Sequence, residues 1–412
     1  MSVPDVDSTL ADSQASDEPD GMAIDNPGSN PEQYLQDRER KEYLFQIPGF
    51  GRVLEPWSNL RARLDEKYGF RPTIAFTHLY QYASDTVGPE DEAWGFDLTI
   101  DGTWTPFGRG TDSPSTVGFE FLHRDKMATD IPPAALFAQV GSLYPTSVAF
   151  AEIDPTLGQL WIRQIFKNRF GFHVGKYFPV SAYDFFPLKN FKTDFVDGVH
   201  AANGVIPLPS RGLGGYVVYR PRPSVYLRAG LHDANAETEK AGFNSLFGDG
   251  ELFKIFEVGF DPGFMERKPE RPPFGDVHVS FWHQDKRKDD NVDDGWGFVV
   301  SGSQRFGRFM PFLRYGYADS SRKGPTAIEH MVNGGVAIYD IFGQSNDRIG
   351  IGLTWSDPAD DSLDDQGAVD TFYRVQVTPQ IAVTATVQLI IDPVRNSKDA
   401  VWVPGVRTRF AF

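Results

Sequence analysis

The sequence predicts an all-β fold: a transmembrane antiparallel β-barrel of about sixteen strands, with a short N-terminal amphipathic helix and inward-folded loops. Three observations predict it. Beyond Pro72 almost every segment alternates apolar and polar residues with period two, and clusters of Gly, Pro, Asp and Asn separate the segments. Aromatic residues stand at the ends of apolar strand faces, and the last strand, which alternates in the same way, ends at Phe412.

Residues 94–104 illustrate the alternation. The even positions form an apolar face with Trp94 and Trp104 at its ends, whereas the odd positions include Asp97 and Asp101. Ten steps of about 3.3 Å, tilted by about 40°, project to roughly 25 Å, the height of the apolar band on an outer-membrane barrel. The two tryptophans then fall where aromatic girdles lie. We therefore expect the apolar face to contact lipid and the polar face to surround water.

A soluble β-sandwich or propeller is the alternative architecture, because its strands also alternate between an apolar and a polar face. The core of such a protein prefers aliphatic residues throughout. It needs neither aromatic residues gathered at strand ends nor a terminal phenylalanine. The pattern therefore favours the barrel.

Composition and charge exclude several classes of protein. The 412 residues carry a formal charge of −16 and include no cysteine. The acidic balance argues against nucleic-acid binding, because Lys and Arg must neutralise phosphates. Without cysteine there is no disulfide framework, thiolate metal site or cysteine nucleophile. The charge-free run 131–151 contains prolines and cannot be a continuous spanning helix.

The chain divides into three parts. Residues 1–42, rich in Asp, Glu, Pro, Ser and Gly, are typical of a disordered acidic leader. Residues 43–72 form an N-terminal helical segment, in which Pro56 suits the helix start and Gly69 its C-terminal cap. Residues 73–412 form the transmembrane barrel. No secretory signal is visible at the start of the sequence, although a barrel of this kind is expected in the bacterial outer membrane.

Several motifs between about residue 45 and the end recur in one known family. They are Trp57 to Lys67, Val174 to Lys176, Arg228 to Asn235, Arg314 to Asp319 and, most specifically, Phe372 to Pro379 followed by Val387 to Pro393. In these motifs the chain resembles the carbohydrate-selective outer-membrane porins (OprB-type). The resemblance implies a sixteen-stranded barrel that admits sugars across the outer membrane of a Gram-negative bacterium. The long acidic leader departs from the family pattern.

With the polar parity facing inward, the lumen carries charges of both signs. Guanidinium groups donate hydrogen bonds to sugar hydroxyls, and carboxylates accept hydrogen bonds from them. A sugar can therefore replace its hydrogen bonds to water with hydrogen bonds to the wall. It does so without the tight binding that would stop conduction. The predicted pore-lining charges are Arg163, Arg228, Arg314, Arg374, Arg407, Arg409, Asp97, Asp101, Glu120, Glu257 and Asp370. The inward rings of Trp161, Tyr226 and Trp282 could stack on the apolar face of a pyranose. Alternatively, they pack beneath an inward-folded loop.

Residues 177–205 do not alternate cleanly, and a long irregular segment within a compact barrel is usually functional. We expect this segment to fold inward as a constriction loop, with an outward surface loop as the alternative. The charged residues of the predicted constriction are Lys176, Asp184, Lys189, Lys192, Asp194 and Asp197. The proline-rich run Ile131 to Ala151 is a second candidate.

No catalytic or metal site follows from the sequence. His278 and His283 are five residues apart and therefore lie on opposite strand faces, and the motifs of hydrolases and nucleotide-binding proteins are absent. We expect neither enzymatic activity nor a cofactor.

Three functions remain open at this point. A passive channel for small sugars such as monosaccharides is favoured. A general or otherwise substrate-specific porin for small hydrophilic solutes is the second, and a soluble β-rich carbohydrate-binding protein or hydrolase the third. The expected partners are small sugars, outer-membrane lipid and lipopolysaccharide, the barrel-assembly machinery through Phe412, and further copies of the chain in a homotrimer.

Overall fold

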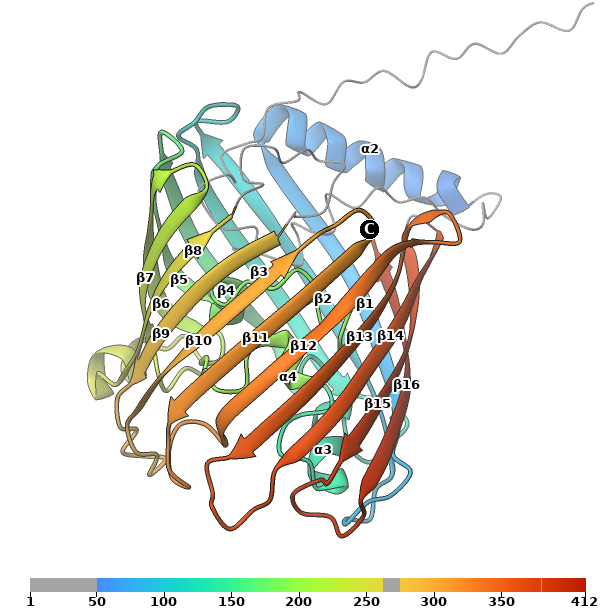
Figure 1. The fold of residues 1–412 in the computed structure, drawn as a ribbon. Coiled ribbons are helices and arrows are strands. Elements are labelled where there is room, and N and C mark those ends of the chain that lie inside the picture. Colours follow the sequence, from blue (N-terminus) through green and yellow to red (C-terminus); the bar gives the residue numbers. More distant parts are fainter. Residues whose placement is uncertain (1–49, 262–274, 379) are drawn as a thin grey trace, which may run out of the picture.

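The computed structural model describes residues 50–261, 275–378 and 380–412, which form one closed barrel. Its sixteen strands are all antiparallel and follow one another around the wall in chain order, and the first strand, β1, pairs with the last, β16 (Figure 1). Closure leaves no free sheet edge, so the backbone groups of every strand can be paired within the wall, as a hydrocarbon environment demands. The predicted barrel and its strand number are confirmed, and the sandwich alternative is wrong.

The strands vary in length, and the helical elements are short apart from the first. The strands are β1 (Phe70–Tyr82), β2 (Glu92–Phe107), β3 (Ser115–Lys126), β4 (Ile153–Phe166), β5 (Phe170–Tyr177), β6 (Gly212–Arg222), β7 (Val225–Asp233), β8 (Leu252–Phe260), β9 (Gly275–Gln284), β10 (Gly295–Gln304), β11 (Phe309–Asp319), β12 (Ile328–Ile341), β13 (Gln344–Pro358), β14 (Gln366–Thr378), β15 (Ile381–Ile391) and β16 (Ala400–Ala411). The helical elements are α2 (Phe50–Tyr68), η1 (Pro133–Ala135), α3 (Leu136–Val140), η2 (Pro179–Ser181), α4 (Gly198–Ala201) and the π-helical turn η3 (Ser245–Asp249). Among the described residues, no helix combines the length and apolarity of a membrane span.

The two faces of the strands differ as the alternation predicts. On β2, Asp97 and Thr99 are buried inside the wall, whereas Ile100 and Trp104 are 40% and 45% exposed on its outside. Other large apolar side chains exposed on the outer face include Phe121, Leu160, Ile162, Phe256, Phe281, Leu313 and Leu353. Because side chains alternate with period two along a strand, the opposite parity must point inward. The apolar side of the wall therefore faces outward and the polar side faces the interior.

The two ends of the barrel differ in the length of their connections. At one end the chain turns within short segments such as 167–169 and 223–224, whereas at the other it forms the long connections 127–152, 178–211 and 234–251. Outer-membrane barrels have short periplasmic turns and longer extracellular loops. The asymmetry of this barrel follows that pattern, and the end with the short turns is here called the short-connection end. Helix α2 and the C-terminus both lie at this end (Figure 1).

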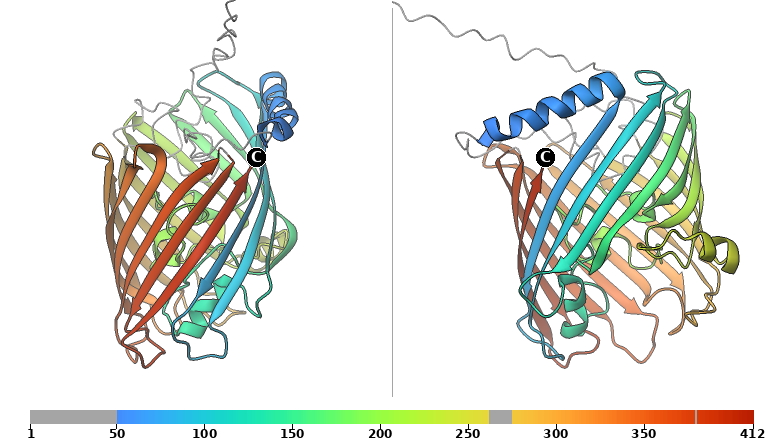
Figure 2. Two further views of the ribbon diagram at one scale, coloured as in Figure 1. Left: turned by 90° about the vertical axis from the view of Figure 1, so that its right-hand side faces the viewer. Right: turned by 180° about the vertical axis from the view of Figure 1, so that it is seen from behind.

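Helix α2 lies along one side of the short-connection end, beside the start of β1 (Figures 1 and 2). It ends at Tyr68 because Gly69 adopts a left-handed conformation, with φ of 66°, and its N–H donates to the carbonyl oxygen of Asp65 at 2.8 Å. The predicted C-terminal cap is confirmed. The carboxylate of Asp65 also pairs with Arg71 of β1, with 2.8 Å between Oδ1 and Nε, which ties the helix to the wall.

The start of α2 differs from the prediction. The helix begins at Phe50, and Pro56 lies inside it. A proline lacks an N–H group and so removes one intrahelical hydrogen bond. The helix nevertheless continues through Pro56 in both directions, so the predicted start at this residue is wrong. The predicted leader, residues 1–42, lies outside the described residues.

Two of the long connections fold into the barrel, which confirms the predicted inward-folded loops. Connection 127–152 contains η1 and α3, and connection 178–211 contains η2 and α4. Every residue from 182 to 197 is buried. Phe195 of the second connection packs on the inward ring of Phe372 with 4.9 Å between ring centroids, and Val140 of α3 packs among buried residues of β15 and β16. The interior core thus forms between the wall and these two connections.

Candidate functional site

The predicted pore-lining charges lie on the inner face of the wall. The residues that are buried there are Arg163, Arg228, Arg314, Arg374, Arg407, Arg409, Asp97, Glu120, Glu257 and Asp370. Asp101 is half-buried near the short-connection end of β2. Arg348 of β13 is a further buried inward arginine, which the prediction omits. The alternation along β13 would have predicted the inward position of Arg348, because the neighbouring residue Ile349 belongs to the apolar residues that face outward.

Asp184 anchors the first part of connection 178–211 to the wall. Its carboxylate forms an ion pair with Arg314 of β11 and lies 3.1 Å from Nε2 of His278 of β9. Its backbone N–H donates to Oε2 of Glu257 of β8 at 2.9 Å. Burial alone would raise the pKa of the Asp184 carboxyl, but the Arg314 guanidinium and His278 hold that pKa well below its ordinary value. Arg228 of β7 donates nearby to the carbonyl oxygen of Ala182.

Ten residues further on, the same connection is anchored by a second set of charges. Nζ of Lys192 lies 2.8 Å from Oδ1 of Asp97 on β2. Asp194 accepts from Arg348 of β13 at 2.5 and 3.1 Å. Arg407 of β16 donates to the carbonyl oxygen of Asp194 at 2.7 Å. These contacts fix both the side chains and the backbone of the connection.

The two anchors contact different parts of the wall. The first uses β8, β9 and β11, and the second uses β2, β13 and β16. In a ring of sixteen strands in chain order, β2 at Lys192 lies seven strands from β9 at Asp184, whereas β13 at Asp194 lies only two strands from β11. Connection 178–211 therefore crosses the interior from one wall to the other between Asp184 and Lys192.

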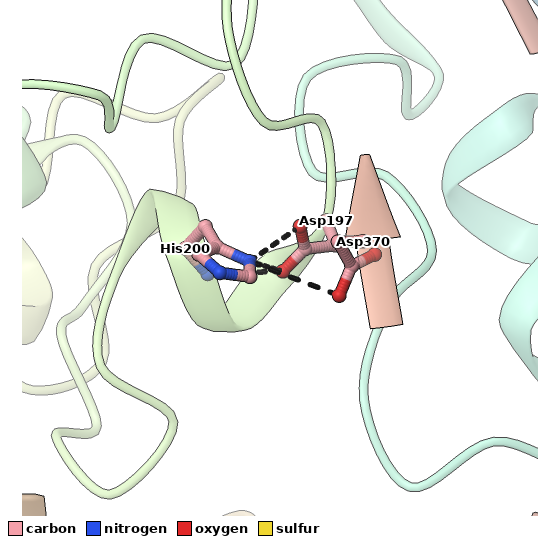
Figure 3. A group of neighbouring side chains, drawn as sticks. All are labelled: Asp197, His200 and Asp370. Atoms are coloured by element: carbon pink, nitrogen blue, oxygen red, sulfur yellow. Dashed lines mark hydrogen bonds and ion pairs between the residues drawn. The ribbon is translucent and has the colours of Figure 1, made fainter. Parts of the chain in front are cut away.

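Helix α4 makes a third contact between this connection and the wall (Figure 3). Asp197 caps the helix by accepting from the backbone N–H of His200 at 2.9 Å, and its carboxylate also lies 2.8 Å from Nδ1 of His200. Asp370 of β14 faces the same imidazole, with Oδ2 3.9 Å from Nδ1. The sequence does not indicate this meeting, because Asp370 is distant in the chain.

The remaining predicted loop charges serve local contacts. Lys189 donates to the carbonyl oxygen of Tyr183 at 2.9 Å, within the same connection. Lys176 lies at the end of β5, where its Nζ donates to the carbonyl oxygens of Thr238 at 2.6 Å and Lys240 at 2.8 Å. It therefore fastens connection 234–251 to the barrel.

The inward aromatic residues form an extended group. The ring of Trp161 lies 4.5 Å from His173 of β5, which in turn stacks on Tyr216 of β6 at 4.9 Å between centroids. The guanidinium groups of Arg163 and Arg228 lie 5.6 Å from the Trp161 ring and 5.3 Å from the Tyr216 ring, respectively. His173 and Tyr216 are absent from the predicted set, although they share the inward parity of their strands.

Tyr226, Trp282 and Trp161 each occupy space that a glycine on the neighbouring strand leaves open. A Cβ atom added to Gly118 would lie 2.1 Å from the Trp161 ring, and one added to Gly259 would lie 2.1 Å from the Tyr226 ring. The Trp282 ring lies in the same way beside Gly297, where a Cβ would come within 2.7 Å of Nε1. All three rings are buried, so each has a packing role in the wall.

Connection 127–152, the second candidate constriction, is held by neutral groups. The side-chain amide of Gln366 on β14 accepts from the backbone N–H of Leu143 at 2.9 Å and donates to Oγ of Ser142 at 3.0 Å. Gln388 of β15 donates to the carbonyl oxygen of Thr146 at 2.7 Å. The two inward connections touch each other, because the N–H of Gly198 donates to the carbonyl oxygen of residue 145 at 2.8 Å.

The interior therefore contains two inward connections enclosed by a closed wall with an apolar outside. The sequence model of the family described as carbohydrate-selective porin, OprB family, matches residues 138–412. The chain belongs to this family. Membership and fold together make the protein an outer-membrane porin, a carbohydrate-selective channel rather than an enzyme.

Solved structures support the fold. The high-pH structure of Pseudomonas putida OprB has a TM-score of 0.68 and 14% identity, over 86% of this chain and 97% of that chain. The low-pH structure of the same protein has a TM-score of 0.51 and 12% identity, over 86% and 96%. No curated protein matches the chain.

Proposed function

We propose that this porin selects monosaccharide-sized sugars where connection 178–211 crosses the barrel. The observation that carries the proposal is the double anchoring of this connection, by Asp184 to β9 and β11 and by Lys192 to β2 across the barrel. A segment fixed on both sides narrows the lumen without a further partner. Its fixed donors and acceptors can exchange hydrogen bonds with sugar hydroxyls, and weak exchange of this kind permits passage.

Within this channel we assign the principal sugar contact to Arg163 and Trp161. They are 8% and 5% exposed, whereas Tyr226 and Arg228 are fully buried and Arg228 bonds the inward connection. The indole presents an apolar ring and the guanidinium presents several donors, which matches the two faces of a pyranose. The other predicted charges act mainly by holding the connection in place.

Planar-bilayer recording with glucose titrated into the bath tests this function. We expect ionic current to fall with glucose concentration and to saturate, because an occupied sugar site obstructs ions. In Trp161→Ala the half-blocking concentration should rise about fivefold, since a ring contact contributes about 1 kcal/mol. Trp296→Ala is the matched control, because this indole lies on the outer face and is 46% exposed. A current that glucose does not change would favour a general porin for small hydrophilic solutes.

Further expected partners belong to the membrane. The exposed apolar outer face supports contact with outer-membrane lipid and lipopolysaccharide. Phe412 ends the chain beside β1, where its N–H donates to the carbonyl oxygen of Ile74 at 2.9 Å. This position beside the closing strand pair supports recognition of Phe412 by the assembly machinery. A homotrimer stays a prediction, and analytical ultracentrifugation in detergent would test it.

A further inference from the structure

Three ionisable side chains meet where α4 touches the wall. Asp197 and His200 come from the inward connection and Asp370 comes from β14 (Figure 3). One nitrogen or oxygen atom from each lies within 4.8 Å of the others, and all three residues are buried. The cluster therefore combines two carboxylates and one imidazole, drawn from two segments far apart in the chain.

The charge of this cluster is poorly compensated. Within the described part of the chain, His200 is the only basic side chain at ion-pair distance from either Asp197 or Asp370. Oδ2 of Asp370 is buried, points toward the imidazole and receives no hydrogen bond. An ionised carboxylate without a partner is costly to bury. The site thus lacks positive charge.

The imidazole can turn a lone pair toward the carboxylates. Nε2 of His200 lies 2.9 Å from Nδ2 of Asn333, and Oδ1 of that amide is buried without a hydrogen-bond partner. Rotating the Asn333 amide by 180° would let Oδ1 accept a proton held on Nε2. Nδ1 would then be free to bind a metal. A second group that fixes the tautomer in this way is usual behind metal-bound histidines.

We propose that Asp197, His200 and Asp370 bind a divalent transition-metal ion, for which Zn²⁺ is the probe. Zn²⁺ binds imidazole nitrogen and carboxylate oxygen at about 2.0–2.2 Å, so its tetrahedral ligands lie about 3.4 Å apart. The distances of 2.8 Å and 3.9 Å from Nδ1 to the two carboxylates bracket that value. Two carboxylates and a neutral imidazole balance the charge of the ion. The bound ion would fasten the crossing connection to β14.

Metal titration of the purified full-length protein in detergent tests this site. Co²⁺ should bind with a visible absorption band, and Zn²⁺ should displace it at a stoichiometry of one. Asp370→Asn, which preserves the size of the side chain, should weaken Zn²⁺ binding at least about tenfold. Loss of a group that only hydrogen-bonds to a metal ligand already weakens binding by about that factor. His330→Gln, on the outer face, is the matched histidine control and should bind as the wild type does. Ca²⁺, which prefers oxygen ligands only, should not compete at equal concentration.

Thermal unfolding separates metal binding from a purely structural role. Zn²⁺ should raise the melting temperature of the wild type and of His330→Gln but not of Asp370→Asn. His200→Gln provides a second variant that leaves the Asp197 helix cap in place. Absence of Co²⁺ and Zn²⁺ binding in the wild type, or unchanged binding in both site variants, would overturn the proposal. The result does not depend on whether the channel conducts sugar.

Discussion

The two connections that fold into the barrel are held by different chemistry. Connection 127–152 is held by side-chain amides such as Gln366 and Gln388 and by apolar packing around α3. Connection 178–211 is held by buried charges, with Asp184 on one wall and Lys192 on the other. A neutral hydrogen bond contributes about 1 kcal/mol net, whereas leaving one partner of a buried ion pair unpaired costs about 3–5 kcal/mol.

This difference bears on how firmly each connection is positioned. An amide that loses its partner can be replaced by other neutral contacts, but a buried guanidinium or carboxylate must find an opposite charge. The crossing connection therefore has few alternative positions inside the wall. We infer that these charges fix the position of the constriction more than they increase the stability of the fold. A buried ion pair often stabilises a protein no more than apolar side chains of the same volume would.

The largest expected effect comes from removing the first anchor. Arg314→Met removes two bonds to the crossing connection, the ion pair with the buried Asp184 carboxylate and the hydrogen bond to the carbonyl oxygen of Val199, and leaves His278 as the remaining partner of Asp184. The free energy of unfolding should fall by about 3–5 kcal/mol. Urea unfolding of the protein folded in lipid vesicles measures this loss. Single-channel conductance should rise at the same time, because one end of the crossing segment is released.

Two variants control this result. Adding Asp184→Asn to Arg314→Met removes the carboxylate charge that has lost its guanidinium partner, so the double variant should recover much of the lost stability. Arg322→Met, at a side chain that is 80% exposed, should change stability by less than about 0.5 kcal/mol. If the double variant were as unstable as Arg314→Met, lost packing rather than unpaired charge would explain the effect.

The sequence predicts the wall better than it predicts the anchors. Period-two alternation assigns each strand residue to a face, so Asp97 and Trp104 fall on the correct sides without any knowledge of pairing. The partner of an inward charge is a different matter. Asp184 meets Arg314 and Lys192 meets Asp97 only because the connection turns into the barrel, and an irregular segment has no period from which its path could be read.

The same limit explains the unexpected cluster at α4. A search along the chain finds metal ligands by their spacing, and Asp197 and His200 have the spacing of one helical turn. The third member, Asp370, is one of many inward-facing charged residues. It can be identified as part of the cluster only once the path of the folded connection is known. Pro56 shows a local limit of the opposite kind, since a residue that favours helix starts lies inside α2.

A smaller effect is expected at the second anchor. Lys192→Met removes an ion pair with Asp97, but that carboxylate keeps Arg124, whose Nε lies 2.5 Å from Oδ2. The loss of unfolding free energy should therefore be about 1.5–3 kcal/mol, typical of one charged hydrogen bond. The measurement is the same urea titration in vesicles. A loss as large as that of Arg314→Met would mean that Arg124 does not compensate Asp97, and the comparison of the two anchors would need revision.

The smallest effect tests the neutral connection. Gln366→Leu removes the acceptor of the Leu143 N–H and the donor to Ser142, and should cost about 1 kcal/mol in vesicles. The half-blocking glucose concentration should stay at the wild-type value, because every charged anchor of the crossing connection remains. The bond from the Gly198 N–H to the carbonyl of residue 145 links the two connections, however. A changed sugar block in Gln366→Leu would therefore indicate that the neutral connection positions the charged one, and that the two act as a single constriction.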